Sequence, residues 1–250
     1  MKHISSFIGN VGDILSNHAF SNYLASKGVV DYEKVEIRHF YKNIPESLKL
    51  SFDSVFEECQ SNNETLIIGG GGFLDYWVED SRTATTIDVS LDILSNTDFK
   101  LVISSIGSFP HKSVTVKNLE KFIQFMKILS CRKNTYVMLR NDGSFNELST
   151  VLPSSVMEGL YDGADNAYLT EIETFKKYEV DKNYIALNIA SDQLYMKSKH
   201  REAIDVHNFK KQILITINFI VRSLGKKVVL VPHLLSDVQF YVELCLELDD

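Results

Sequence analysis

The sequence of 250 residues is poor in cysteine, proline and tryptophan. Its three cysteines, Cys59, Cys131 and Cys245, lie far apart and form no CxxC pair. This spacing excludes a disulfide framework and a cysteine metal site, and it predicts reduced thiols in a cytoplasmic protein. No apolar run suits a bilayer, because basic residues interrupt the longest one, residues 213–231. The first residues, MKHISSFIGNVGD, are too polar for a signal peptide and predict a strand followed by a glycine turn.

Positive charge is also scarce, since 26 Lys and Arg stand against 33 Asp and Glu, a formal net charge of −7. Such a balance repels a phosphate backbone, and no local basic patch compensates, so we expect no nucleic-acid partner. Apolar residues make up 44% of the chain and charged residues 24%, the ordinary shares of a folded protein. The sequence therefore predicts a sizeable core.

Short apolar runs alternate with amphipathic stretches, the pattern of a parallel, doubly wound α/β sheet. We expect a first α/β domain over residues 1–155 and a second over residues 156–250, smaller and either minimal or cut short. In the first domain we expect strands at 4–8, 35–40, 65–68, 101–105 and 136–139, and helices after Asp13, at 47–58 and at 116–131. In the second we expect a strand at 184–190, a helix at 207–224 and a strand at 227–231.

The first loop of interest, Gly9-Asn10-Val11-Gly12-Asp13, follows the first expected strand and opens a helix. Open α/β sheets bind ligands beyond the carboxyl ends of their strands. Glycines allow positive φ there, and the helix amino terminus offers free N–H groups to an anion. Asp13 is either the N-cap of the helix or a carboxylate that faces the ligand.

The second loop is the run Gly69-Gly70-Gly71-Gly72, which follows the expected strand at residues 65–68. Four consecutive glycines are costly in backbone entropy, so we expect a ligand or a neighbouring segment to pass close to Gly70, Gly71 and Gly72. The alternative is a wide structural turn, because the run is neither a full GxGxxG nor a phosphate-binding P-loop.

Two further loops place polar residues after strands. Ser105 and Gly107 lie at the end of the fourth strand, where they line a ligand site or cap a helix. Arg140 follows the fifth strand, where its guanidinium either binds a carboxylate or phosphate or forms a structural ion pair with Asp142. Ser144 is the expected N-cap of the next helix.

In the second half, His233 comes directly after the expected strand at 227–231 and Pro232. An imidazole at a strand end is commonly structural, but here it would face the ligand groove of a two-domain protein and exchange a proton or bind phosphate. The remaining histidines are interpreted as core or surface residues.

In this order, the loops resemble those of the polysaccharide pyruvyltransferase family, and the resemblance spans residues 9–237. The matching segments are GNVGD at 9–13, GGGGF at 69–73, SIG at 105–107, RNDGS at 140–144, ADNAYL at 164–169, VPH at 231–233 and SD at 236–237.

The resemblance implies a GT-B-like, two-domain transferase that moves a pyruvyl group from phosphoenolpyruvate to a sugar as a ketal. Its acceptor would be a bacterial surface polysaccharide or a lipid-linked precursor at the cytoplasmic face of a membrane. Arg140 and His233 would bind the donor, with His233 also a proton donor, and Asp13 would serve as base. The glycine loops, Ser105 and Ser144 would contact substrate, and neither a metal nor a cofactor is required.

Two other functions fit the same pattern. A GT-B glycosyltransferase that uses a nucleotide sugar would need a carboxylate in the second domain to hold the ribose, for which Asp237 and Glu243 are the candidates. A non-catalytic, glycan-binding member of the family would tolerate the loss of Arg140 or His233.

Overall fold

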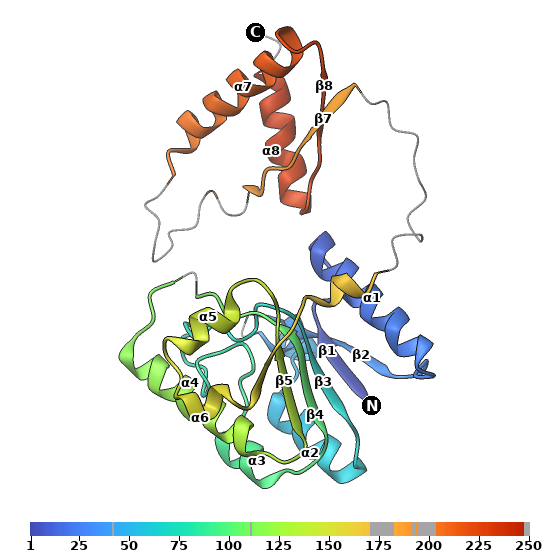
Figure 1. The fold of residues 1–250 in the computed structure, drawn as a ribbon, viewed down its shortest axis with the longest axis vertical. Helices are drawn as coiled ribbons and strands as arrows, with labels where there is room; N and C mark the ends of the chain where they lie inside the picture. Colours follow the sequence, from blue (N-terminus) through green and yellow to red (C-terminus); the bar gives the residue numbers. More distant parts are fainter. Residues whose placement is uncertain (42, 111, 171–182, 192–193, 195–203, 248–250) are drawn as a thin grey trace. The chain divides into compact units, whose positions relative to one another are not determined.

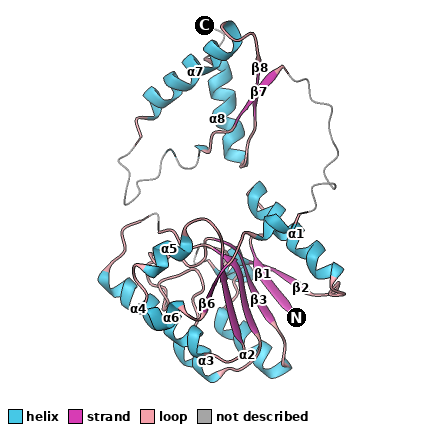
Figure 2. Cartoon of the chain, viewed as in Figure 1, coloured by secondary structure: helices cyan, strands magenta, loops and turns pink. Residues whose placement is uncertain are grey.

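The structure of the chain is a computed structural model, drawn in Figures 1 and 2. It divides into two units, one comprising Met1–Ile8 and Asp13–Glu171, the other Gly9–Gly12 and Ile172–Asp250. The structure describes residues 1–41, 43–110, 112–170, 183–191, 194 and 204–247.

The first unit contains a six-stranded parallel sheet with the strand order β2-β1-β3-β4-β5-β6. Its buried strands are rich in Leu, Ile and Val, as expected for parallel strands covered by helices. The predicted parallel α/β sheet is therefore confirmed. The strands are β1 (Lys2–Ser5), β2 (Glu33–Glu36), β3 (Leu66–Gly71), β4 (Leu101–Ile106), β5 (Thr135–Leu139) and β6 (Leu160–Asp162).

One face of this sheet packs against a layer of helices whose buried side chains join the main hydrophobic core. Helix α4 has the predicted bounds, and the Thr115 side chain caps it by accepting a hydrogen bond from the backbone N–H of Asn118. The helices of the first unit are α1 (Val11–Ser26), α2 (Phe52–Asn62), α3 (Leu91–Asn96), α4 (Val116–Cys131), α5 (Ser144–Ser149) and α6 (Ser154–Met157).

Helix α1 covers the opposite face. Adjacent residues of a strand point to opposite faces of a sheet. In β1, Ile4 belongs to the core shared with α2, whereas the ring of His3 contacts Phe20 of α1. Helices on both faces and a parallel sheet define a Rossmann-like α/β fold.

The strand order changes direction between β1 and β3. The chain runs outward from β1 to β2, then crosses back to β3 on the other side of β1. Ligands of open α/β sheets bind where the strand order reverses, beyond the carboxyl ends of the strands. In this unit that place lies at the ends of β1 and β3, next to the start of α1.

Several element bounds differ from the sequence expectation. Strand β2 ends at Glu36, and the predicted remainder of that strand is the 3-10 helix η1 (Ile37–Phe40), capped by the Glu36 side chain. Helix α2 begins at Phe52 rather than at residue 47, because Glu46–Leu48 forms a separate 3-10 helix, η2. The first unit also continues beyond residue 155, where we expected the domain boundary, because β6 pairs with β5.

The second unit has a smaller core. Its two described strands pair in parallel, and helices α7 and α8 supply most of the buried apolar side chains, including Ile217, Phe240, Tyr241 and Leu244. The first three elements agree with the expected strand, helix and strand, whereas the final helix, α8, was not predicted. They are β7 (Tyr184–Leu187), α7 (Val206–Arg222), β8 (Lys227–Leu230) and α8 (Leu235–Leu246).

Candidate functional site

The glycine run is part of a strand rather than a loop. Gly69 and Gly71 lie in β3 and pair with Ser104 and Ile106 of β4. A Cβ on Gly69 would overlap the carbonyl group of Ser104 and lie 2.8 Å from its carbon atom. The close approach predicted for this run is therefore made by the neighbouring strand. Only Gly72, which is exposed, follows the strand.

Gly70 differs from its neighbours because its φ is +80°, a conformation that favours glycine. A Cβ there would lie 3.2 Å from the Ser5 hydroxyl and 3.5 Å from both the Ser16 hydroxyl and Asn17 Oδ1. The Ser16 hydroxyl and Asn17 Oδ1 are buried and have no hydrogen-bond partner among the described residues. Because Gly70 has no side chain, the polar atoms of Ser5, Ser16 and Asn17 surround its Cα at the end of β3, where the strand order reverses. We call this group of atoms the polar cradle.

Ser105 continues this polar surface onto β4. It is fully buried and has a φ of +54°, at a point where the register between β4 and β5 shifts. Non-glycine residues in this conformation are strained and concentrate at functional sites. The Ser105 hydroxyl accepts a hydrogen bond from the backbone N–H of Asn166 (2.8 Å), so the segment after β6 returns to the same edge. Asn166 Nδ2 is buried without a partner among the described residues.

Arg140 lies directly over Gly107. A Cβ on Gly107 would be 2.6 Å from Nε and Nη2 of Arg140, so only glycine leaves room for the guanidinium. Arg140 Nε donates to the Asp142 carboxylate, which shows that the structural ion pair is formed. Within the described part of the chain, neither Nη atom has a hydrogen-bond acceptor, and they are the atoms that an anion could bind.

Ser144 is the first residue of α5, and the N-cap is Gly143. The prediction of Ser144 as N-cap is wrong because its hydroxyl has other partners. It donates to the Asp142 carboxylate and accepts from the backbone N–H of Ser108 (2.7 Å). Ser144 is fully buried, so it supports Asp142, which in turn orients Arg140.

Asp13 lies in the first turn of α1 and is not its N-cap, because the helix begins at Val11. Burial raises the pKa of the Asp13 carboxyl above its usual value, an effect that the Ser6 hydroxyl and the positive charges of Arg38 and Arg140 partly offset. The nearby charge of Asp165 raises this pKa further. Asp13 and Arg140 thus interact electrostatically within the first unit.

The turn before Asp13 contains a glycine with positive φ, as the sequence predicts. Gly9 has a φ of +98°. Asn10 Oδ1 accepts a hydrogen bond of 2.7 Å from the backbone N–H of Gly12 and so caps the start of α1. The Asn10 side chain therefore has a structural role, and the exposed backbone of Gly9 and Gly12 remains accessible.

His233 follows β8 in the second unit, as expected, and its side chain is exposed. Its backbone N–H donates to the carboxylate of Asp237 (2.9 Å), and the imidazole makes no hydrogen bond to the residues that the structure describes. Asp237 is fully buried and also accepts from the backbone and hydroxyl of Ser191 and from the backbone of Leu234. These donors lower the pKa of Asp237 to about 2.

Both carboxylates proposed to hold a ribose have partners within the second unit. Asp237 is enclosed by its four hydrogen bonds, and Glu243 pairs with Lys210 at 2.6 Å. The candidate role of Asp237 as a ligand residue is therefore wrong. Its carboxylate is buried and accepts all its hydrogen bonds from this unit, so it stabilises the loop before α8.

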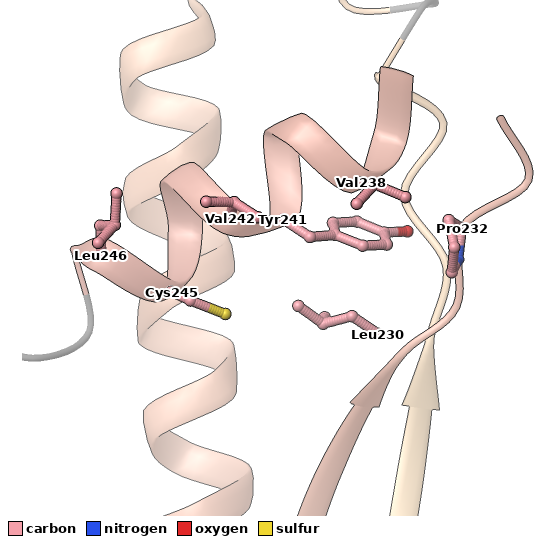
Figure 3. A pocket seen from close by; sticks show the side chains of 7 residues that line it. All are labelled: Leu230, Pro232, Val238, Tyr241, Val242, Cys245 and Leu246. Atoms are coloured by element: carbon pink, nitrogen blue, oxygen red, sulfur yellow. The ribbon is translucent and has the colours of Figure 1, made fainter. Parts of the chain in front are cut away.

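The second unit also contains an apolar pocket of about 400 Å³ beside β8 and α8, shown in Figure 3. The ring of Tyr241 lies against it, and its hydroxyl accepts from the backbone N–H of Ile189 (2.8 Å) and donates to the backbone carbonyl of Val231 (3.0 Å). With no charged side chain in its lining, this pocket does not suit an anionic donor. It is lined by Leu230, Pro232, Val238, Tyr241, Val242, Cys245 and Leu246.

Sequence reasoning missed several residues at the edge of the first sheet. Ser16, Asn17 and Asn166 carry the unpaired polar atoms, and Arg38 and Asp165 act on the charge of Asp13. Asn17 lies one helical turn after Asp13, a spacing that could have identified it. Asn166 lies in the segment 164–169 that contributes to the family resemblance, but its distance in sequence gave no indication of its contact with Ser105.

The described residues contain no group of three or more His, Cys, Asp and Glu side chains placed to hold a metal ion. Among the described helices, none has the length and apolar character needed to cross a membrane. Comparison of the chain with protein-family models, with curated proteins and with solved structures found no match in any of the three.

The first unit therefore combines, at one sheet edge, a carboxyl that can exchange a proton, a guanidinium with free Nη atoms and a buried polar cradle. A general base needs a pKa closer to neutrality than that of an ordinary aspartate, and burial shifts Asp13 in that direction. This arrangement suits a small anionic substrate that reacts with a hydroxyl group.

Proposed function

We propose that the protein is a pyruvyltransferase that moves the pyruvyl group of phosphoenolpyruvate onto a sugar. The proposal joins the family resemblance of the loops at residues 9–237 with the chemistry at the carboxyl edge of the first sheet. It includes a GT-B-like pairing of two α/β domains and an acceptor in a bacterial surface polysaccharide or its lipid-linked precursor. The reaction would take place in the cytoplasm, where a lipid-linked acceptor would bring the enzyme to the membrane surface.

The observation that carries this proposal is the placement of the Arg140 guanidinium over Gly107 at the sheet edge, where its charge also acts on the Asp13 carboxyl. Asp142 and Ser144 hold Arg140 through Nε, which leaves its Nη atoms for the carboxylate or phosphate of the donor. Asp13, with its raised pKa, would accept a proton from an attacking sugar hydroxyl.

The proposed chemistry balances without a redox step. A proton adds to the methylene carbon of phosphoenolpyruvate, and a sugar oxygen forms a bond to C2 as its own proton leaves. The C2–O bond to phosphate then breaks, and a second sugar oxygen adds to C2 with loss of its proton, which gives the ketal and inorganic phosphate. His233 is the proposed donor of the first proton, and Asp13 the acceptor of a hydroxyl proton.

Phosphate release from phosphoenolpyruvate in the presence of a panel of mono- and disaccharide acceptors tests the proposal, with the ketal product identified by mass spectrometry. Asp13→Asn should lower the rate about a hundredfold, the ordinary contribution of a general base. Asp31→Asn, which removes an exposed acid between α1 and β2, should leave it unchanged. Absence of both phosphate release and ketal with every acceptor would count against the proposal.

A further inference from the structure

Another pocket, of about 440 Å³, lies in the first unit between α1 and the residues that follow β1 and β2. Its lining combines exposed apolar side chains with polar groups. Ile8 and Ile14 are 60% and 45% exposed, respectively, whereas Asn17 is 4% exposed. Asn17 belongs both to this pocket and to the cradle at Gly70, so the two sites are adjacent.

Asn17 offers a hydrogen-bond acceptor whose orientation is determined. Its Nδ2 donates to the backbone carbonyls of Ser6 and Asp13, at 2.7 Å and 2.9 Å. Both partners are acceptors, so the amide cannot be reversed and Oδ1 is the atom without a partner among the described residues. A hydroxyl group donates to such an atom, whereas a carboxylate or phosphate cannot.

The uncompensated charge of the pocket is positive. The Glu36 carboxylate accepts from the backbone N–H of Phe7 (2.8 Å) and from Arg38 Nη1 (2.6 Å), so it is neutralised. Lys34 Nζ lies over the rings of Phe7 and Tyr32, 5.9 Å and 5.5 Å from their centroids. No carboxylate of the described residues lies within 4.0 Å of Lys34 Nζ. His18 and His39 add further nitrogen atoms to the lining.

We propose that this pocket binds the sugar acceptor and that the acceptor is an anionic pyranoside. The C–H face of the ring would pack on Ile8 and Ile14, a hydroxyl would donate to Asn17, and the carboxylate or phosphate substituent would pair with Lys34. This inference rests on the proposed function, because it names the acceptor side of the same sheet edge. Asp13 lies one helical turn before Asn17 on the same face of α1, where it could receive a proton from a hydroxyl of the bound sugar.

Isothermal titration of the full chain without phosphoenolpyruvate tests this inference with three probes: methyl β-D-glucuronide, α-D-glucose 1-phosphate and methyl β-D-glucoside. At least one anionic probe should bind more tightly than the neutral glucoside, and whichever binds identifies the substituent as carboxylate or phosphate. Lys34→Met should weaken binding of that anionic probe about fivefold and leave the neutral glucoside unaffected.

Lys27→Met is the matched control, because Lys27 is also exposed and lies 5.4 Å from the centroid of an aromatic ring, that of Tyr23, outside this pocket. It should bind all three probes like the wild type, whereas Ile14→Trp should fill the pocket and abolish binding. The inference is overturned if neither anionic probe binds, or if Lys27→Met weakens binding as much as Lys34→Met. Probe binding without turnover of phosphoenolpyruvate would refute only the proposed function.

Discussion

The imidazole of His3 makes the stability of the first unit depend on pH. The side chain is fully buried in β1, and its ring contacts those of Phe7 and Phe20 at centroid distances of 5.2 Å. Neither ring nitrogen has a hydrogen-bond partner among the described residues. Burial, together with the nearby charge of Lys34, lowers the pKa of His3 to about 3.

The sign of the effect follows from the two pKa values of His3. In the unfolded chain the imidazole has a pKa of about 6.5, so it takes up a proton at a pH where the folded state stays neutral. Stability is therefore lost as the pH falls below about 6.5 towards 3. Between about pH 7.5 and about pH 5.0, the contribution of His3 to the free energy of unfolding falls by about 2 kcal/mol.

Urea unfolding of the wild type and of His3→Phe at these two pH values measures this contribution. Trp77, the single tryptophan of the chain, lies in the first unit, so its fluorescence follows the unfolding of that unit. The stability of His3→Phe should fall by about 2 kcal/mol less than that of the wild type across the interval. His18→Gln, at an exposed imidazole, should retain the pH dependence of the wild type. Equal losses in wild type and His3→Phe would refute the reasoning.

Three further substitutions test the packing of the two units. Gly69→Ala forces a Cβ into the Ser104 carbonyl and should destabilise the first unit by about 3 kcal/mol in urea unfolding. Gly107→Ala should displace the Arg140 guanidinium and weaken phosphoenolpyruvate binding about tenfold in calorimetry, with a smaller effect on stability. Asp237→Asn should cost the second unit about 3 kcal/mol, measured by circular dichroism at neutral pH. Because the pKa of Asp237 is lowered to about 2, this loss should shrink as the pH falls below about 3.8 towards 2.

Matched variants separate these effects from backbone strain and from loss of charge. Gly28 and Gly143 have positive φ but open space around them, so alanine there should cost only about 1 kcal/mol and leave phosphoenolpyruvate binding intact. Glu243→Gln breaks a partly exposed ion pair and should destabilise the second unit much less than Asp237→Asn. The packing argument fails if Gly143→Ala weakens binding as much as Gly107→Ala, or if Glu243→Gln destabilises as much as Asp237→Asn.

Hydrophobic periodicity was sufficient to predict the parallel sheet and the bounds of α4, because both depend on local patterns. It was not sufficient for β3, where Gly69 and Gly71 were interpreted as a loop. Glycine disfavours strands on average, but here the close approach of Ser104 requires it. This requirement depends on the neighbouring strand and is absent from the local sequence.

In the candidate site, too, local sequence patterns predict some features, whereas others depend on contacts between segments that are distant in sequence. The sequence placed Asp13 and Arg140 after strands, and the parallel topology brings such positions to one edge. It did not indicate the left-handed backbone of Ser105, because serine has no preference for it and the register shift in β4 imposes it. It also missed Asn166, because that contact exists only once β6 has joined the sheet.

Titration of phosphoenolpyruvate into the wild type and Arg140→Gln tests the central claim most directly, because it measures whether the free Nη atoms of Arg140 bind the donor. Lys49→Met, which removes an exposed cation paired with Glu46, serves as control. We predict saturable binding to wild type and Lys49→Met, and at least a tenfold loss of affinity in Arg140→Gln. Equal affinity of all three proteins, or no binding to the wild type, would contradict the account.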